Sequence, residues 1–239
     1  YMQLRLKKMI RSATMLHFTS ELEANEAPEF ILPYQRVIEP LGIRLSPEPS
    51  SVNDSSGVRS QHNIPGSDVL LTFLGRLHPI KGLEILLNAL KRLAADEQSL
   101  SLLICGPAEN GYDELLKSRV AELGLTHRVK FTGMLSRPEI AATLKESDLF
   151  VLPSHHENFG VSALEALASG TPVVVSQNVG IACFLRDAGV GVVAAGNDAA
   201  LADAISTLST SEETRLRYAA NCRNVVAEKF SWESIAARW

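Results

Sequence analysis

The stretch SHHENFGVSALEALASGTPVVV, residues 154–175, decides the fold because it predicts a loop, a buried helix, a tight turn and a buried strand in succession. The run DLFVLP before it, residues 148–153, is apolar and ends in proline, as a buried strand of a parallel sheet does. Residues 161–168 are almost entirely Ala, Leu and Val, so we expect this helix to be covered on most sides. Gly170 stands where a left-handed helix cap belongs. The stretch therefore predicts one strand–helix–strand unit of a parallel sheet.

Two carboxylates in this stretch indicate a binding site. Glu157 lies in the loop and Glu165 in the helix, with seven residues between them. No cation stands three or four residues from Glu165, and an ionised carboxylate among Ala and Leu is costly unless a donor reaches it. The loop and first helical turn should present free backbone N–H groups at the positive end of a helix dipole. These N–H groups belong to Asn158, Phe159, Gly160 and Val161. The pattern suits a ligand with hydroxyls at both ends and negative charge in the middle.

A second candidate site lies in the loop GRLHPIKG, residues 75–82, which follows a predicted strand. Arg76 could bind a diphosphate through its planar, forked guanidinium, and Lys81 could bind it as a point charge. Gly75 would let the backbone turn and approach the ligand closely. Taken alone the signal is weak, because Arg and Lys after a strand are usually solvated.

Together, these residues resemble a known family. Glu157 and Glu165 with their spacing resemble the Glu-x7-Glu motif of retaining glycosyltransferases of family 4, and residues 73–82 are similar to that family's donor-phosphate loop. The family has the GT-B fold, in which two Rossmann-like domains face each other across a cleft. The alternative is a purely structural role, in which Glu157 is an acid at a helix terminus and Glu165 is a buried glutamate paired with a distant Lys or Arg. Two motifs in the right order on one sheet edge favour the family.

The resemblance implies a role for each residue. Glu165 would accept hydrogen bonds from ribose hydroxyls, and Glu157 would bond the hydroxyls of the transferred sugar, without acting as a covalent nucleophile. Arg76, Lys81 and the N–H groups at the helix start would stabilise the charge that grows on the leaving diphosphate. Attack on the same face of the sugar would retain its configuration, with the leaving phosphate taking the acceptor's proton. Glu157, Arg76 and Lys81 are therefore the catalytic candidates.

Topology and resemblance place the nucleoside base at the ends of two further strands. These ends are Gly106-Pro107 and residues 132–135. In a doubly wound sheet, ligands bind beyond the carboxyl ends of the strands. Plain strand-end turns explain the same residues equally well.

The resemblance also implies that the enzyme needs no cofactor or metal and takes a UDP- or GDP-sugar as donor. The chain has no Asp-x-Asp pair to hold a metal. His156-Glu157 does not begin a zinc His-Glu-x-x-His site, because Gly160 stands where the second His is required. His155 and His156 invite an acid–base role, but ordinary loop histidines are the simpler interpretation.

The rest of the chain predicts an α/β fold with a doubly wound parallel sheet, because apolar runs alternate with helices from residue 69 onward. Residues 1–45 resemble the last units of the family's N-terminal, acceptor-binding domain, residues 46–68 form a Pro/Ser/Gly-rich linker, and residues 69–239 form the donor-binding, Rossmann-like domain. Strands are expected at 69–74, 100–105, 128–133, 148–153, 173–175 and 190–193, and helices at 82–95, 112–123, 138–146 and 161–168 and from Asp198 and Ser211.

One residue and one segment depart from the family pattern. Asn158 stands where Gly often follows the first glutamate. Residues 176–181 stand in place of the Gly-rich, Glu-containing loop that contacts the ligand in much of the family.

Composition limits the function further. A formal charge of −4 gives no general attraction to nucleic acid. Three widely spaced cysteines, Cys105, Cys183 and Cys222, suit reduced thiols in a cytoplasmic protein. No run is apolar over the ~20 residues that a bilayer crossing needs. The basic residues Arg5, Lys7, Lys8 and Arg11 could contact the inner face of a membrane, where lipid-linked acceptors lie, or form a solvated helix face.

The leading hypothesis is the transfer of a sugar from a nucleoside diphosphate sugar to a glycan or lipid-linked acceptor, as in polysaccharide biosynthesis. A non-catalytic nucleotide-sugar-binding module is the second hypothesis, because most of the acceptor domain is missing from this chain. A nucleotide-sugar epimerase of the same fold is the third, and the two motifs together argue against it.

Overall fold

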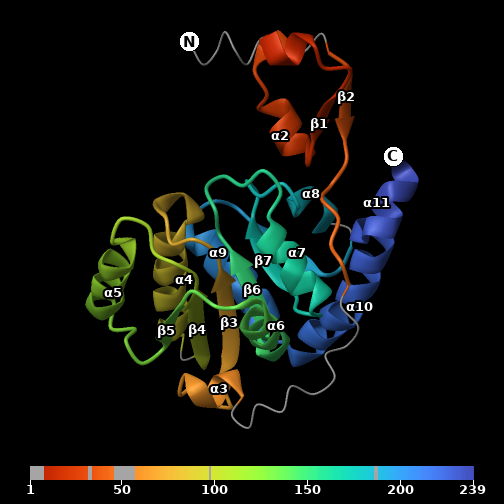
Figure 1. Ribbon diagram of the computed structural model, residues 1–239. Coiled ribbons are helices and arrows are strands. Elements are labelled where there is room, and N and C mark those ends of the chain that lie inside the picture. Colours follow the sequence, from red (N-terminus) through yellow and green to blue (C-terminus); the bar gives the residue numbers. More distant parts are fainter. Residues whose placement is uncertain (1–7, 32–33, 46–56, 97, 186–187) are drawn as a thin grey trace.

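The computed structural model describes residues 8–31, 34–45, 57–96, 98–185 and 188–239. Its main body is a six-stranded parallel sheet with the strand order β5-β4-β3-β6-β7-β8 (Figure 1). The order reverses between β3 and β6, which is the switch point of a doubly wound fold. The strands are β3 (Val69–Leu74), β4 (Leu100–Cys105), β5 (Val129–Gly133), β6 (Leu149–Leu152), β7 (Val173–Ser176) and β8 (Gly191–Ala194).

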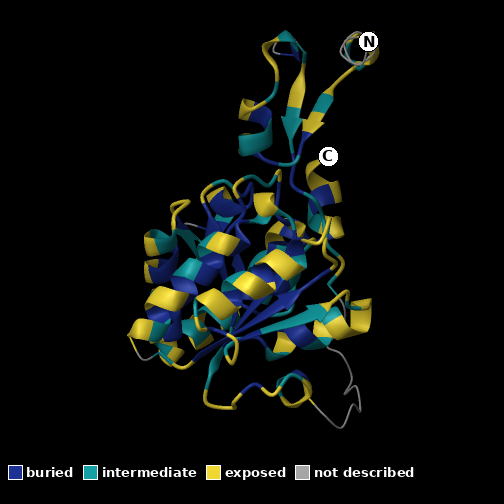
Figure 2. Cartoon of the chain, turned by 90° about the vertical axis from the view of Figure 1, so that its left-hand side faces the viewer, coloured by how far each residue is buried: buried dark blue, intermediate teal, exposed yellow. Residues whose placement is uncertain are grey.

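The central strands are apolar because helices cover both of their faces. Every residue of β4, β6 and β7 is buried, so these strands appear dark blue in Figure 2. Strand β3 pairs in register with β4 from Val69↔Leu100 to Leu74↔Cys105 and also pairs with β6. The continuous apolar runs predicted from the sequence are therefore the buried parallel strands that such runs favour.

The helices form two layers around the sheet (Figure 1). Helices α4, α5 and α9 pack side by side on one face, and α6, α7 and α10 pack on the other. The helices of the main body are α3 (Val58–Gln61), α4 (Leu83–Ala95), α5 (Tyr112–Glu122), α6 (Arg137–Glu146), α7 (Val161–Ala168), α8 (Ala182–Leu185), α9 (Asp198–Ser209), α10 (Glu212–Phe230) and α11 (Trp232–Arg238).

A small N-terminal lobe, residues 8–31 and 34–45, lies beyond the carboxyl ends of the strands (Figure 1). Its buried apolar residues are Phe18, Ala24 and Ile31. It contains β1 (Leu16–Phe18), α2 (Glu21–Asn25), the 3-10 turn η1 (Glu29–Ile31) and β2 (Arg36–Ile38), with β1 and β2 parallel.

The lobe is tied to the C-terminal end of the chain. The Ile43 N–H donates to the Phe230 carbonyl at 2.7 Å, and Arg238 pairs with Glu39 at 2.6 Å. His17 packs edge-on against Trp239 with ring centroids 5.2 Å apart. Helix α11, which the sequence pattern did not predict, therefore extends from the main body to the lobe.

The predicted linker is structured in part. Residues 46–56 lie outside the described part of the chain. Residues 58–61 form α3, and Val58 and Ile64 are buried against Leu70 and Leu103 of the sheet. The C-terminal part of the predicted linker is thus packed on the main body.

Two of the four basic residues considered for membrane contact, Arg5 and Lys7, lie outside the described residues. Lys8 and Arg11 are exposed on the helical residues 8–11. Among the described helices, none combines the length and the apolar character that a membrane crossing requires.

The cysteines are free thiols. Burial raises the pKa of Cys105 and of Cys222 to about 12, whereas Cys183 is exposed.

Candidate functional site

The loops that follow β3, β4 and β5 are joined by backbone hydrogen bonds at one edge of the sheet. The Gly75 N–H donates to the Cys105 carbonyl at 3.0 Å, and the Gly106 N–H donates to the Gly133 carbonyl at 2.8 Å. Gly106 has φ +137°, and a Cβ at this position would lie 2.0 Å from the Gly75 carbonyl oxygen. Only glycine fits this contact. Gly75 and Gly106, which were both predicted to contact the nucleotide-sugar donor, therefore hold adjacent loops together.

The loops after β6 and β7 continue the same edge. The His155 N–H donates to the Ile80 carbonyl at 2.8 Å, which ties the loop after β6 to the loop after β3. The Glu157 N–H donates to Asn178 at 3.0 Å, and the Glu157 carbonyl accepts from Gly180 at 2.9 Å. The backbone of Glu157 is therefore fixed on both sides by residues of the segment 176–181, which departs from the family pattern.

Lys81 and Glu157 meet at this edge. The Lys81 ammonium forms an ion pair with the Glu157 carboxylate, and the Ser154 hydroxyl lies 3.5 Å from the same carboxylate oxygen. The Lys81 side chain is 17% exposed and that of Glu157 is 24% exposed, so the pair is shielded but still reachable from solvent. The structure thus brings one residue of each predicted motif into direct contact.

Arg76 is engaged elsewhere. Its side chain is 64% exposed, and its guanidinium pairs with Glu109, from the loop after β4, at 2.8 Å. A ligand that binds Arg76 must therefore compete with Glu109. The sequence reasoning did not single out Glu109, although its place in the loop after the neighbouring strand was a signal.

The Glu165 carboxylate has no hydrogen bond or ion pair with any other described residue of the chain. It is half-buried in α7, and burial raises the pKa of its carboxyl, while the charge of Arg137 acts in the opposite direction. An acid left without a donor in these surroundings is free to bind a hydrogen-bond donor from outside the chain. Arg137 begins α6 at the end of β5, and the capping box formed by Ser136 and Glu139 was the sequence signal for that position.

The start of α7 offers free donors. Gly160 caps the helix with φ +98°, and a Cβ there would lie 2.6 Å from Val179. Phe159 is buried and packs edge-on against Phe230 with centroids 6.0 Å apart, so it anchors the loop to the core. Within the described ranges, the N–H groups of Asn158, Phe159, Gly160 and Val161 have no hydrogen-bond partner. The structure therefore leaves these four N–H groups available to an anion.

The surroundings of the two loop histidines bear on their suggested acid–base role. His155 is exposed. His156 lies 3.2 Å from Glu26 and 3.0 Å from the Asn158 side-chain oxygen. Both ring nitrogens of His156 thus have partners within the chain, as those of an ordinary loop histidine do.

The candidate base-binding residues lie where the topology predicts them, after β4 and β5. Met134 is 80% exposed, and the Thr132 hydroxyl donates to the Gly133 carbonyl at 2.8 Å. Their contact with a base stays a prediction.

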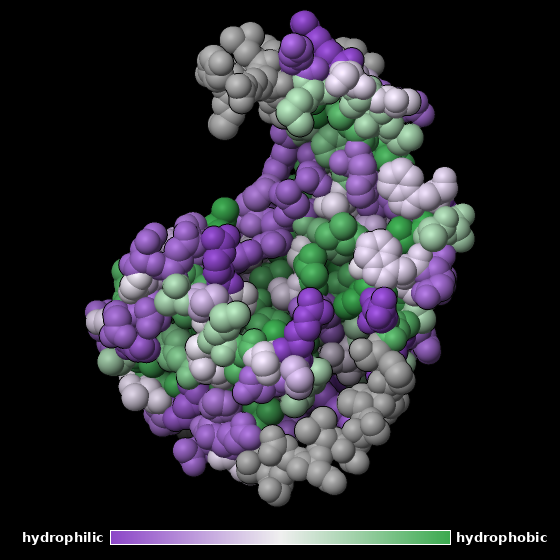
Figure 3. Space-filling model, viewed as in Figure 1, coloured by the Kyte–Doolittle hydropathy of each residue, from purple (hydrophilic) through white to green (hydrophobic). Residues whose placement is uncertain are grey.

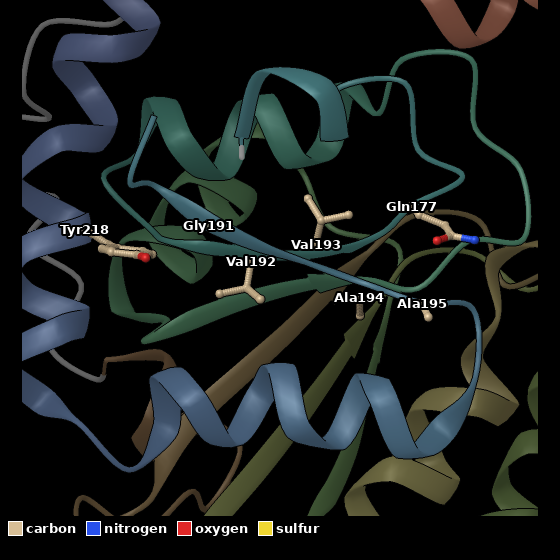
Figure 4. Close-up of a pocket in the computed structure, with 7 residues that line it drawn as sticks. All are labelled: Gln177, Gly191, Val192, Val193, Ala194, Ala195 and Tyr218. Atoms are coloured by element: carbon tan, nitrogen blue, oxygen red, sulfur yellow. The ribbon is translucent and has the colours of Figure 1, made fainter. Parts of the chain in front are cut away.

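The surface is hollowed between the N-terminal lobe and the main body, with hydrophilic side chains along the recess (Figure 3). A separate hollow of about 400 Å³ lies between β8 and α10 (Figure 4). It is lined by Gln177, Gly191, Val192, Val193, Ala194, Ala195 and Tyr218. None of the predicted site residues lines this second hollow. Within the described part of the chain, no three His, Cys, Asp or Glu side chains gather as metal ligands do.

Comparisons with known proteins give the relatives of this chain. A family model described as glycosyl transferases group 1 matches residues 55–225. The chain is 32% identical over 193 residues to a D-inositol 3-phosphate glycosyltransferase of Corynebacterium efficiens, covering 78% of this chain and 45% of that protein. It is 34% identical over 206 residues to a phosphatidyl-myo-inositol mannosyltransferase of Mycobacterium leprae, covering 84% of this chain and 54% of that protein. The chain thus spans about half the length of these curated relatives.

Solved structures show the same fold. Sucrose-phosphate synthase from Thermosynechococcus elongatus superposes with a TM-score of 0.83 at 25% identity, covering 98% of this chain and 59% of that one. HepE from Anabaena, solved in complex with UDP and glucose, superposes with a TM-score of 0.85 at 23% identity, covering 99% of this chain and 64% of that one. The α/β fold predicted from the sequence, the Rossmann-like half of a GT-B fold, is confirmed.

Proposed function

Because the chain belongs to the glycosyl transferases group 1 family, we propose that it is the donor-binding part of a retaining, metal-independent glycosyltransferase of family 4. Its donor is a UDP- or GDP-sugar, and its acceptor is a glycan or a lipid-linked saccharide. The HepE structure, which contains UDP and glucose, supports this class of donor.

One observation carries the proposal: the contact between Lys81 and Glu157 beside the free N–H groups that start α7. A cation, a carboxylate and unpaired donors lie together at the carboxyl edge of a parallel sheet, where such folds bind ligands. Glu165 adds a carboxylate that lacks a partner among the described residues of its own chain. The set matches a ligand with phosphate charge between two groups of hydroxyls.

In the proposed reaction, the bond between the anomeric carbon and the phosphate oxygen breaks, and negative charge grows on the leaving diphosphate. Lys81, Arg76 and the N–H groups of residues 159–161 stabilise that charge. Each such donor typically contributes about 2.7–4 kcal/mol to transition-state stabilisation. Glu157 orients the transferred sugar through its hydroxyls, and Glu165 holds the ribose. The leaving phosphate takes the proton of the attacking acceptor hydroxyl, which approaches on the same face of the sugar.

Isothermal titration with UDP, GDP, UDP-glucose and GDP-mannose, each with and without EDTA, tests the donor class. We expect one nucleotide series to bind and EDTA to leave its affinity unchanged. If neither series binds, the proposed site is wrong; if EDTA abolishes binding, metal independence is wrong.

Retention is tested separately by NMR of the slow hydrolysis of the donor that binds, with water as acceptor. The α-anomer should be released first from an α-linked donor, before mutarotation. Release of the β-anomer would contradict the retaining mechanism.

A further inference from the structure

The N-terminal lobe contacts the loop that carries Glu157. The buried Ser20 hydroxyl donates to the Asn158 carbonyl at 2.5 Å, and the Asn158 side-chain amide donates to the Glu23 carboxylate at 2.9 Å. His156 of the same loop lies 3.2 Å from Glu26. We name these five residues, Ser20, Glu23, Glu26, His156 and Asn158, the lobe contact. Two segments 135 residues apart in the sequence are thus joined beside the predicted donor site.

Glu23 is well placed to hold Asn158 because its own position is fixed. One of its carboxylate oxygens accepts from the Thr19 N–H and the Thr19 hydroxyl, both at 2.7 Å, while the other oxygen accepts from Asn158. The Glu23 N–H donates to the Ser20 hydroxyl at 3.1 Å. The start of α2 therefore presents an ordered acceptor to the loop, and the hydrogen bond to a charged acceptor is of the stronger kind.

The Asn158 carbonyl is closely packed, although the residue itself is exposed. A Cβ on Gly180 would lie 1.9 Å from the Asn158 carbonyl oxygen and 2.6 Å from the Ser20 hydroxyl. The peptide of Asn158 is thus held between the lobe and the segment after β7. Because this peptide connects Glu157 to the free N–H groups of Phe159 and Gly160, its orientation sets where both point.

We propose that Glu23 is a positioning residue of the donor site: through Asn158 it fixes the loop so that the Glu157 carboxylate and the N–H groups of residues 159–161 face one ligand. The inference rests on the proposed function. It assigns a contribution to donor binding to the N-terminal lobe, which neither of the two sequence motifs includes.

The test exchanges donor and acceptor across the contact. Asn158→Asp sets two carboxylates against each other, whereas Glu23→Gln combined with Asn158→Asp restores a hydrogen bond, now donated by the new glutamine, and restores the wild-type net charge. We expect Asn158→Asp to weaken UDP-glucose binding about tenfold or more, as loss of a hydrogen bond to a charged group does, and the double variant to return to within about threefold of wild type. Glu21→Gln, on an exposed residue of the same helix, is the control and should bind as wild type does.

Rescue distinguishes positioning from simple repulsion. If the new aspartate acted only by repelling the diphosphate, Glu23→Gln would relieve that repulsion only in part, because the aspartate remains, and incomplete rescue would overturn the proposal. A double variant that stays more than about threefold weaker than wild type is therefore the contrary result.

Amide hydrogen exchange of the ligand-free protein separates this inference from the proposed function. Exchange at residues 157–161 should become faster in Asn158→Asp and return toward the wild-type rate in the double variant. If wild type binds no nucleotide sugar but exchange follows this pattern, the contact orders the loop and the proposed function fails. If wild type binds and every variant binds and exchanges alike, the proposed function stands and the positioning role fails.

Discussion

Replacing Glu157 by Gln should tighten the binding of UDP without tightening that of UDP-glucose. In the free protein, Lys81 is paired with the Glu157 carboxylate, and both side chains are largely shielded from solvent. A diphosphate that binds Lys81 brings its negative charge close to that carboxylate. Glutamine keeps an acceptor for Lys81 and removes the repulsion, so the nucleotide itself gains affinity.

The magnitude follows from the geometry of a shared cation. Two N–H···O contacts of about 2.8 Å, made along the tetrahedral N–H directions of one ammonium, place carboxylate and phosphate oxygens about 4.6 Å apart. With an effective dielectric constant of about 40 to 80 for a pair that solvent can still reach, their repulsion is about 0.9–1.8 kcal/mol, which corresponds to an affinity gain of about 5- to 20-fold for UDP. For UDP-glucose this gain is offset, because a charged acceptor for the sugar hydroxyls becomes neutral and about 1 kcal/mol is lost.

The assay is isothermal titration of wild type and Glu157→Gln with UDP and with UDP-glucose at low and high salt. The ratio of UDP-glucose to UDP affinity should fall about fivefold, and the gain for UDP should shrink in high salt because salt screens the repulsion. Glu213→Gln, which removes an exposed charge at the start of α10, controls for net charge. Unchanged or weaker UDP binding in Glu157→Gln would refute the idea that Lys81 is shared between the carboxylate and the phosphate.

Four further outcomes follow from the structure. Arg76→Ala should weaken UDP binding about tenfold and leave uridine binding almost unchanged in titrations, because the guanidinium serves the diphosphate. Glu165→Gln should stabilise the free protein increasingly as pH rises above the ordinary glutamate range. Burial raises the folded-state pKa of Glu165, so ionisation of the wild-type carboxyl lowers the stability of the folded state as pH rises. Thermal melts of both proteins from acid to neutral pH measure the difference. Gly160→Ala should lower the free energy of unfolding by about 1–3 kcal/mol, measured by urea denaturation, because φ is positive there and the new Cβ meets Val179. In the native state only Cys183 should react quickly with a thiol reagent, and unfolding should expose the two buried thiols.

Much of the main body could be predicted because each strand carries its own signal. The runs at 100–105 and 149–152 are continuous apolar segments between helical patterns, and the structure forms β4 and β6 there. Helix α3 could not be predicted in this way. Its four residues lie in a polar, Ser- and Gly-rich segment, and their helical state depends on the burial of Val58 against residues distant in the sequence.

The candidate site likewise has features that the local sequence predicts and features that depend on tertiary placement. Lys81 and Glu157 could be expected to share an edge, because both lie in loops that follow parallel strands, but their direct contact depends on β3 and β6 being neighbours in the sheet. The Arg76–Glu109 pair and the Glu23–Asn158 hydrogen bond depend on tertiary placement across 33 and 135 residues. No local pattern contains that information.

The loops at the site are held by backbone contacts, whereas the chemistry is assigned to side chains. Gly82 shows this separation: with φ +68°, it lies against Pro153, whose carbonyl oxygen would be 2.2 Å from an added Cβ, and so it locks the loop of Lys81 to the end of β6. Gly106 does the same between the loops after β3 and β4. Substitutions of Arg76, Lys81 or Glu157 leave these contacts intact, so their effects on binding should report charge and hydrogen bonding at the ligand. Substitutions of the glycines should instead lower stability and affinity together, and this contrast distinguishes a residue that binds the donor from one that shapes the site.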